Sequence, residues 1–452
     1  MKKFIFMRLL IICAGLTTMQ VNAQVDITVN TLTVIANDVG TKYGINLNAG
    51  IDSDLNRAKG YTPLVDVLSS LGVKHLRYPG GKKSLYYAWS THPFTDANTS
   101  YWVPSWYEKA AKNTLDFDAF MLIAKQVGAE PHINVAYNPQ HNLGAELAAA
   151  WVKYANITHN YNIKYWEIGN EMWQKDLGFN IKTLCTLANT YALTMKAEDP
   201  SILIGISWRK NQVQKVINNC GNAIDFVAIS DYTNYQGSYK SYADTNNAKL
   251  IGVNESATKR IIVSEFAPST WTKNTEDLAN DTGKGIINFD QIGQYLTSPN
   301  TEYAAFWNTH WYDLSNTPRD AMDNANNLLP VALPMTLWAR YIKNQLVEIR
   351  NNHSDIVTYA AYDQDSGNLN LFIINKGMNA HQTKIKINAK YSYKAKALVE
   401  RFQGKSALDK QPTLSVEEDA DLSNNTINTV LPPTSISLFS LLANEFVAKR
   451  IR

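Results

Sequence analysis

Two glutamates each end a short apolar segment of this chain, Tyr165 to Glu171 and Arg260 to Phe266. A carboxylic acid and a carboxylate that face one cleft can cleave a glycosidic bond by double displacement. The acid protonates the leaving oxygen, and the carboxylate attacks the sugar carbon. We interpret Glu171 as the acid/base and Glu265 as the nucleophile. In this interpretation the charge of Glu265 raises the pKa of Glu171, whereas an arginine must keep Glu265 ionised.

Such a pair needs a scaffold that brings two distant strand ends together. Eight β-rich segments alternate with helical patterns, which is the count for a (β/α)8 barrel. The predicted strands are residues 42–47, 74–78, 131–136, 164–168, 202–206, 225–229, 260–263 and 301–306. The predicted helices are residues 64–71, 117–127, 145–156, 183–197 and 334–345. Glu171 and Glu265 then follow strands four and seven, at the C-terminal mouth where barrel enzymes place their catalytic groups.

The pattern changes after residue 346 to short alternating strands separated by Gly, Asn, Asp and Ser turns. Residues 356–359, 369–374, 384–387 and 435–439 are predicted strands. We expect a catalytic barrel over residues 40–346 and a β-sandwich over 347–452. An early strand within residues 24–39 is expected to join the sandwich.

The N-terminus has the parts of a secretory signal: two lysines, an apolar stretch and small residues before a cleavage point near Ala23. We therefore expect residues 1–23 to be removed and the protein to be secreted or periplasmic. The apolar stretch is too short for a stable membrane span.

Charge gives no reason to expect nucleic acid as a partner. The formal net charge is +3, and removal of residues 1–23 would take away Lys2, Lys3 and Arg8, leaving acids and bases in balance. Cys185 and Cys220 could pair in an oxidising compartment, but two buried thiols are the favoured interpretation for a core of this size. The oligomeric state is not predicted.

Several segments together resemble glycoside hydrolase family 51, which contains α-L-arabinofuranosidases and some endoglucanases of the barrel clan. They include Asp116-Phe-Asp-Ala-Phe-Met, Asn162-Ile-Lys-Tyr-Trp-Glu-Ile-Gly-Asn-Glu171 and Ala197-Glu-Asp-Pro-Ser201. The resemblance covers most of residues 40–345 and implies the same architecture, a barrel with a β-sandwich.

The resemblance also implies roles around the two glutamates. Asn170 matches the asparagine that binds the sugar hydroxyl next to the reacting carbon. Arg77 matches an arginine that orients the nucleophile and holds it ionised. Tyr232 follows the sixth predicted strand, where the family places an aromatic residue or histidine near the nucleophile.

Departures from the family concern the substrate. The family's arabinofuranosidases carry a glutamate after strand one, where this chain has Asn46 and Asn48. The asparagine expected after Pro-Gly-Gly is replaced by Lys82, followed by Lys83. Two ammonium groups at the mouth would favour an anionic sugar, whereas two solvated loop lysines are the simpler interpretation.

Tryptophans gather in the loops that follow the predicted strands, and their rings could pack on sugar faces or belong to the core. The set comprises Trp89, Trp102, Trp106, Trp173, Trp271, Trp307 and Trp311. Trp173 and Trp307 are predicted substrate contacts, and His310 is either a hydrogen-bond partner of a substrate hydroxyl or a structural group.

Motifs for metal, phosphate loops and serine nucleophiles are absent from the sequence, and the expected reaction needs no cofactor. The sequence thus predicts a retaining hydrolase of plant or algal polysaccharide or oligosaccharide, similar to an α-L-arabinofuranosidase. One alternative is a hydrolase of an anionic glycan, such as a uronide or a sulfated algal polysaccharide. The other is a carbohydrate-binding protein that does not turn over.

Overall fold

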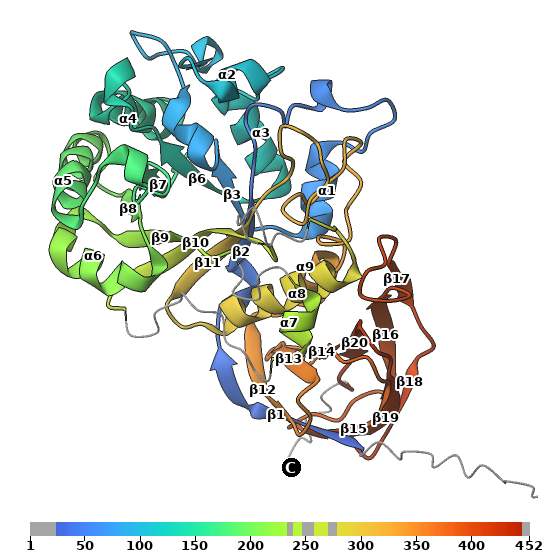
Figure 1. Cartoon of the computed structure of the whole chain (residues 1–452). Helices are drawn as coiled ribbons and strands as arrows, with labels where there is room; N and C mark the ends of the chain where they lie inside the picture. Colours follow the sequence, from blue (N-terminus) through green and yellow to red (C-terminus); the bar gives the residue numbers. More distant parts are fainter. Residues whose placement is uncertain (1–23, 233–237, 246–256, 270–277, 445–452) are drawn as a thin grey trace, which may run out of the picture.

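A closed barrel of eight parallel strands forms the larger part of the protein (Figure 1). The computed structural model describes residues 24–232, 238–245, 257–269 and 278–444. The barrel strands are β2 (Tyr43–Asn46), β3 (His75–Tyr78), β6 (Glu130–Val135), β7 (Tyr165–Ile168), β8 (Leu203–Ser207), β9 (Phe226–Ser230), β10 (Arg260–Phe266) and β11 (Thr301–Phe306). They pair in chain order, and β11 closes the barrel against β2. The predicted barrel is confirmed.

The helices lie outside the barrel, and most of them pack on it with an apolar face. They are α1 (Leu64–Leu71), α2 (Trp106–Ala110), α3 (Phe117–Val127), α4 (Ala145–Val152), α5 (Ile181–Glu198), α6 (Val213–Cys220), α7 (Tyr239–Ala243), α8 (Thr282–Thr297) and α9 (Met335–Tyr341). Capping residues fix where several begin: Asp116 accepts a hydrogen bond at the start of α3, and Asn180 forms a capping box with Thr183 at the start of α5. Two predicted helices differ from the structure near their C-terminal ends. α4 continues as a π-helix over Lys153–Thr158, and α9 ends at Tyr341 because the following residues turn into a strand.

The second domain is one ten-stranded sheet rather than two separate sheets. Pairing of β16 with β20 closes this sheet into a barrel-like shape, so the expected all-β domain is present and its strands are joined in one sheet. Its strands are β1 (Val25–Ala36), β12 (Gln345–Asn351), β13 (Ile356–Tyr362), β14 (Leu369–Asn375), β15 (His381–Asn388), β16 (Lys396–Gln403), β17 (Thr413–Val416), β18 (Ala420–Ser423), β19 (Thr426–Leu431) and β20 (Ser435–Leu441). Its interior is a separate apolar cluster that includes Ile27, Leu371 and Phe439.

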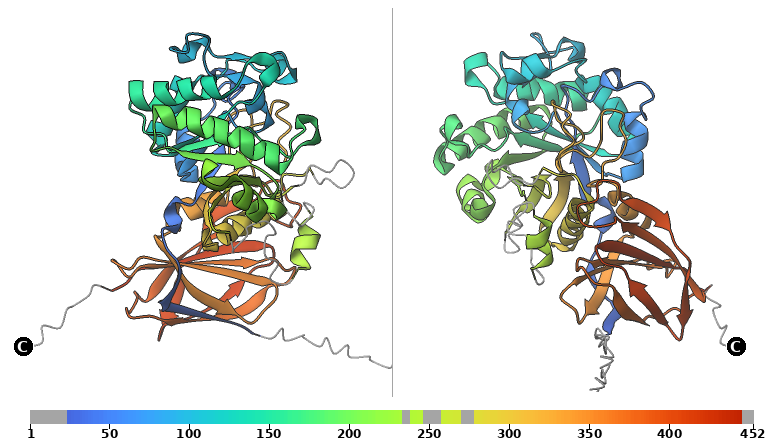
Figure 2. Two further views of the ribbon diagram at one scale, coloured as in Figure 1. Left: turned by 90° about the vertical axis from the view of Figure 1, so that its left-hand side faces the viewer. Right: turned by 45° about the vertical axis from the view of Figure 1, so that its right-hand side comes forward.

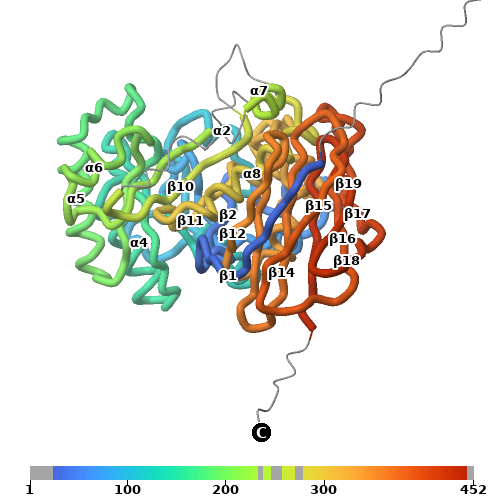
Figure 3. Tube along the Cα trace, turned by 90° about the horizontal axis from the view of Figure 1, so that it is seen from below, coloured from blue at the N-terminus to red at the C-terminus, as the bar shows by residue number. Residues whose placement is uncertain are grey.

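The N-terminal strand belongs to this second sheet. β1 pairs antiparallel with β12 and parallel with β15, so the first described strand lies between two strands from the far end of the sequence (Figure 3). Val25, Ile27 and Val29 point into the sheet core while their neighbours face solvent. The expectation that an early strand joins this domain agrees with the structure.

Helix α8 lies between the barrel and the second sheet (Figure 2). Nearly all of its residues are buried, which is the pattern of a helix packed on more than one side. The hydroxyl of Tyr359 on β13 donates to the Asp290 carboxylate at 2.5 Å, and Gly293 leaves room for the ring of Tyr359. The two parts of the molecule therefore share one packed interface.

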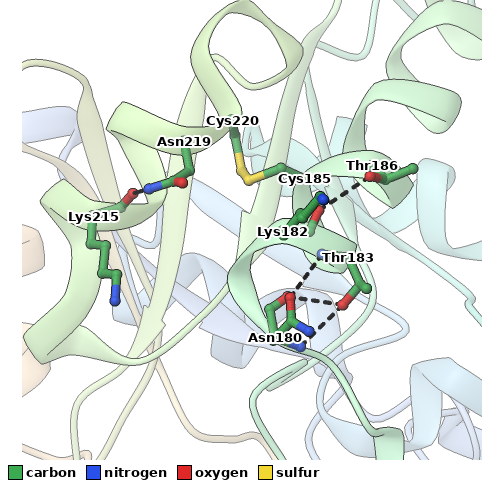
Figure 4. The surroundings of a disulfide bond; sticks show 8 residues. All are labelled: Asn180, Lys182, Thr183, Cys185, Thr186, Lys215, Asn219 and Cys220. Atoms are coloured by element: carbon green, nitrogen blue, oxygen red, sulfur yellow. Dashed lines mark hydrogen bonds between the residues drawn. A yellow bond between two sulfur atoms is a disulfide. The ribbon is translucent and has the colours of Figure 1, made fainter.

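Cys185 on α5 and Cys220 at the end of α6 form a disulfide, with their Cα atoms 4.7 Å apart (Figure 4). The favoured interpretation of two free thiols was wrong. Spacing alone could not reveal the pairing, because it depends on how the two neighbouring helices pack.

Within the described ranges, no helix is long and apolar enough to cross a membrane. The expected signal segment, residues 1–23, lies outside the described residues.

Candidate functional site

Glu171 and Glu265 line one cavity of about 520 Å³ at the C-terminal mouth of the barrel. This volume falls in the usual range for small-molecule sites. The cavity is lined by Lys82, Tyr107, Asn170, Glu171, Trp173, Gln174, Lys210, Ser230, Tyr232, Glu265, Trp307 and Trp311. The structure thus brings together the two glutamates and five of the other predicted contacts, namely Lys82, Asn170, Trp173, Tyr232 and Trp307.

Glu171 lies in the turn that follows β7. Its φ of 45° is in the left-handed region, and its backbone N–H donates to the Ser207 hydroxyl at 2.9 Å. Such backbone positions are costly for residues other than glycine and often occur at functional sites. The side-chain amide of Gln174 donates to Oε2 of Glu171 at 2.5 Å. Burial raises the pKa of Glu171, while Gln174 acts in the opposite direction.

Glu265 is the penultimate residue of β10, and an irregularity in the strand pairing aims its side chain. Ile261 and Val263 pack outward in the core between barrel and helices, whereas Ile262 faces the apolar cluster inside the barrel. Strict alternation would point Glu265 outward with Ile261 and Val263. The register shifts between Val263 and Glu265, and a shift of this kind can redirect a side chain toward an active site.

Two donors hold the Glu265 carboxylate. Arg77 Nη1 lies 3.1 Å from Oε1, and the Tyr232 hydroxyl donates to Oε2 at 2.7 Å. Burial nevertheless raises the pKa of Glu265 to about 7, with Glu171 adding to the rise and Arg77 and Tyr232 opposing it. Arg77 favours the ionised form of Glu265, as expected, but its effect is smaller than that of burial, and Arg77 also binds Glu167.

Arg77 is buried inside the barrel beneath the cavity, and all of its N–H groups are used. Nε and Nη2 donate to the two oxygens of Glu167 at 2.7 and 3.0 Å. Nη1 also donates to Oδ1 of Asn46, and Nη2 to Oδ1 of Asn170. Arg77 therefore does not line the cavity. It fixes two side chains of the lining, Asn170 and Glu265, and two that are not part of it, Asn46 and Glu167.

The contact with Arg77 sets the orientation of the Asn170 amide. Because Oδ1 of Asn170 accepts from Arg77 at 2.9 Å, its amide nitrogen is the atom available to donate to a ligand in the cavity. An amide nitrogen in this orientation can donate to a hydroxyl oxygen of a bound ligand.

Lys82 is neither a free cation nor fully solvated. Its ammonium donates to the amide oxygen of Gln174 at 2.7 Å and contacts Asp176 at 3.0 Å. The chain Lys82, Gln174, Glu171 therefore connects the loop after β3 with the glutamate after β7. Asp176 balances the charge of Lys82, so this lysine offers little to an anionic ligand.

Lys83 is fully buried and has no hydrogen-bond partner for its ammonium. It lies 4.8 Å from the ring centroid of Trp307 and 5.6 Å from that of Trp311. Burial lowers its pKa to about 7. The interpretation of a solvated loop lysine is wrong for Lys83, and its place beneath the Trp rings keeps it out of the cavity lining.

The tryptophans divide between the cavity and the core. Trp173, Trp307 and Trp311 line the cavity, and Gly81 allows the Trp307 ring to approach, since a Cβ there would lie 2.0 Å from it. Trp89 is buried and stacks on Trp151. Trp102 is half-buried, whereas Trp106 is 56% exposed beside Trp311. Trp271 lies outside the described residues.

Three predicted substrate contacts are buried structural groups. Asn46 donates to the carbonyls of Ser264 and Phe306 and accepts from Arg77. His310 uses both ring nitrogens, on Asp52 and on the carbonyl of Asp323. Asn48 donates to the carbonyl of His310. Because all three side chains are buried and lie outside the cavity lining, Asn46, Asn48 and His310 cannot contact a ligand in the cavity from these positions.

Sequence reasoning missed Glu167, His132 and Gln174. Glu167 is fully buried and accepts from Arg77, and His132 Nε2 lies 3.0 Å from Glu167 Oε2. Burial alone would raise the pKa of Glu167, but Arg77 and His132 hold it below its ordinary value. A glutamate within the apolar run of a buried strand was the available signal, since buried charges must be paired.

Comparison with known sequences gives short matches. No protein-family model matches the chain. A probable alpha-L-arabinofuranosidase C of Aspergillus clavatus is 30% identical over 130 residues, covering 24% of this chain and 24% of that protein. Alpha-L-arabinofuranosidase C of Emericella nidulans is 28% identical over 130 residues with the same coverage. The chain thus spans about a quarter of the length of the curated relatives it matches.

Solved structures match over nearly the whole chain. The alpha-L-arabinofuranosidase of Thermotoga maritima in an arabinose complex has a TM-score of 0.73 at 18% identity, covering 93% of this chain and 100% of that one. The family 51 alpha-L-arabinofuranosidase of Thermotoga petrophila gives 0.70 at 18%, covering 92% and 99%. A family 44 xyloglucanase of Paenibacillus polymyxa gives 0.63 at 12%, covering 93% and 100%. The chain therefore has the fold of these glycoside hydrolases, the one expected from its resemblance to family 51.

Proposed function

We propose that this protein is a retaining glycoside hydrolase that acts on a neutral plant polysaccharide or its oligosaccharides, in the manner of an α-L-arabinofuranosidase. The observation that carries the proposal is the cavity shared by Glu171 and Glu265 at the ends of two barrel strands. Active sites of this barrel architecture are built at that face.

In the first step Glu265 attacks the anomeric carbon while Glu171 gives its proton to the leaving oxygen. The bond to the leaving group breaks, and an ester bond between the sugar and Glu265 forms. Arg77 and Tyr232 fix the position of the attacking carboxylate through contacts of 3.1 and 2.7 Å. The amide of Asn170 is available to bind a hydroxyl next to the reacting carbon, a contact that strengthens as charge develops.

In the second step Glu171, now ionised, takes a proton from water, and that water attacks the sugar carbon and releases Glu265. The hydrogen bond from Gln174 to Oε2 holds the carboxyl group of Glu171 in place while its proton is exchanged. The product retains the configuration of the substrate.

The charges around the cavity favour a neutral sugar. Lys82 is balanced by Asp176, Lys210 is paired with Asp231 at 2.6 Å, and Lys83 is buried behind tryptophan rings. These pairings argue against the alternative of a uronide or sulfated glycan, which would need an unbalanced cation. The relatives and solved structures that the chain matches include several arabinofuranosidases, which adds weight to an arabinofuranoside.

We further propose that the protein is exported and loses residues 1–23. The Cys185–Cys220 disulfide supports this proposal, because such bonds persist in oxidising compartments.

Product analysis of residues 24–452 tests the proposed activity. The panel is arabinan, arabinoxylan, xyloglucan and β-glucan, with uronic-acid and sulfated algal polysaccharides as the anionic arm. Release of a neutral sugar is expected, with the anomeric configuration followed by NMR during turnover. Release from the anionic arm alone would contradict the neutral assignment.

Variants of the two glutamates test whether these residues carry out the reaction. Glu171→Gln and Glu265→Gln should each lower turnover by several orders of magnitude while leaving the fold intact. Azide should restore turnover of Glu265→Ala and give a glycosyl azide of inverted configuration, which identifies the nucleophile. Binding of polysaccharide without hydrolysis by the unmodified protein would support the third alternative, a carbohydrate-binding protein that does not turn over.

A further inference from the structure

Three potential metal ligands meet at one end of the second sheet. His353 and Asp355 lie in the turn between β12 and β13, and His381 begins β15. One ligand atom from each residue can be chosen so that all three lie within 4.8 Å of one another. The group belongs to a different domain from the cavity of Glu171 and Glu265.

His381 is the member that the fold does not otherwise explain. His381 is only 3% exposed, yet neither nitrogen of its ring has a hydrogen-bond partner. The Asp355 carboxylate is 3.7 Å from Nε2, which is too long for a hydrogen bond. A buried imidazole without a partner loses its hydrogen bonds to water and gains none in return.

The neighbouring groups are arranged around that imidazole. The rings of His353 and His381 have centroids 4.2 Å apart. Nδ1 of His353 accepts a long hydrogen bond of 3.2 Å from the backbone N–H of Asp355, so its lone pair already faces this turn. Gly377 packs against the Asp355 carboxylate, because a Cβ there would lie 2.2 Å from Oδ2.

We propose that His353, Asp355 and His381 form a binding site for a divalent transition metal, with Zn²⁺ as the best-fitting ion. Two imidazoles and one carboxylate are a ligand set that zinc accepts, with a water in the fourth position. Hard cations such as Ca²⁺ and Mg²⁺ prefer oxygen ligands and fit this set poorly.

Modest side-chain movements complete the geometry. Tetrahedral zinc with ligand bonds near 2.0–2.1 Å places its ligand atoms about 3.4 Å apart. His353 and Asp355 are only partly buried and can close the remaining gap, while His381 stays fixed in its strand. The metal would replace the backbone N–H of Asp355 as the partner of His353.

Such an ion would tie the β12–β13 turn to the start of β15. The same turn is linked to the barrel, because the N–H of Lys376 donates to the carbonyl of Asp355, and Tyr239 on α7 donates to the carbonyl of Lys376. The ammonium of Lys376 is held by the carbonyls of Tyr242 and Thr245, not by Asp355. We therefore assign the ion a structural role.

The test uses the full mature chain without an affinity tag, treated with chelator and then titrated with ZnCl₂ by calorimetry. We expect one equivalent of Zn²⁺ to bind and the midpoint of thermal unfolding to rise with zinc concentration. Co²⁺ added as CoCl₂ should bind in place of zinc and give the intense visible absorption of a four-coordinate cobalt ion.

His381→Ala and Asp355→Asn should each weaken zinc binding at least tenfold. Asp355→Asn keeps the shape of a partly exposed side chain, so it serves if His381→Ala folds poorly by circular dichroism. His159→Ala, which removes an exposed histidine from the barrel, is the matched control and should bind as the unmodified protein does. Absence of saturable binding, or equal binding by all three variants, would overturn the site. Because the readouts do not involve hydrolysis, this outcome leaves the proposed glycosidase activity untouched.

Discussion

Arg77 is bonded to Glu167 at two points, with Nε 2.7 Å from Oε2 and Nη2 3.0 Å from Oε1. Glu265 receives only Nη1, which also donates to Asn46. Arg77 therefore makes more hydrogen bonds to Glu167, which lies outside the cavity lining, than to Glu265. The consequence is that the buried charge of Glu265, the proposed nucleophile, is only partly compensated.

Replacement Glu167→Gln should lower the pKa of Glu265. The negative charge of Glu167 raises that pKa, so its removal makes ionisation of Glu265 easier, and Arg77 is freed to compensate Glu265. Stability should fall at the same time, by about 3–5 kcal/mol, because a buried pair is broken. Titration of labelled glutamate side chains by NMR and chemical denaturation measure the two effects. Glu130→Gln is the control, and an unchanged Glu265 titration would contradict the coupling.

The Glu171→Gln variant offers a second test of the same electrostatics. Ionised Glu171 raises the pKa of Glu265, which is about 7 in the intact pair. Without that charge, Glu265 should lose its proton at lower pH. On a substrate whose leaving group needs no acid, the acidic limb of the kcat/KM profile should therefore move to lower pH. A limb that stays in place would mean that the carboxyl groups titrate independently.

Lys82 should act on Glu171 through Gln174. Both Lys82 and the Gln174 amide favour the ionised form of Glu171, so Lys82→Met should raise the pKa of Glu171 further. The basic limb of kcat/KM, which reports loss of the acid's proton, should move to higher pH. We expect kcat to fall roughly 10- to 100-fold because the amide of Gln174 loses the contact that orients it.

Lys175→Met is the matched control for this prediction. It removes an exposed lysine from the same loop as Gln174. A shift of the basic limb in both variants would indicate a general charge effect rather than an oriented contact.

The barrel and the shared position of the two glutamates at its mouth could be predicted because their signals are local. Each strand is a short apolar run, and each glutamate ends one, so the strand count alone places both at the same mouth. The structural reason why the side chain of Glu265 points inward could not be predicted. It depends on a register shift between β9 and β10, which the residue types in these strands do not indicate.

The buried polar layer shows a second limit of sequence reasoning. Asn46, Asn48 and His310 were predicted to contact the substrate, but all three are buried and bonded to partners far away in the chain. Likewise, Lys82 and Lys83 are neighbours in sequence, yet one reaches Gln174 and the other is enclosed by tryptophans. Such differences follow from tertiary packing, which a single sequence does not display.

Trp106 should extend the binding surface beyond the cavity. It is 56% exposed and stacks on Trp311, with ring centroids 6.3 Å apart and planes 26° apart. The C–H groups of a sugar residue next to the one in the cavity can pack on this exposed face. Trp106→Ala should therefore lower kcat/KM about 2- to 10-fold on polysaccharide and leave a small aryl glycoside unaffected. Tyr101→Ala, another exposed aromatic of the same loop, is the control, and equal losses on both substrates would refute the extended surface.

The Cys185–Cys220 disulfide should contribute substantially to stability. It closes a loop with a sequence separation of 35, for which the chain-entropy estimate is about 4 kcal/mol. The bond joins α5 to α6 on the outside of the barrel, so its loss should lower the midpoint of denaturation without altering the arrangement of Glu171 and Glu265. The double variant Cys185→Ser, Cys220→Ser should unfold at lower denaturant concentration and retain its specific activity below that point.

Intact-mass analysis before and after reduction measures whether the bond forms. A chain that carries two free thiols, or a double variant as stable as the parent, would remove both this contribution and the support that the bond gives to export.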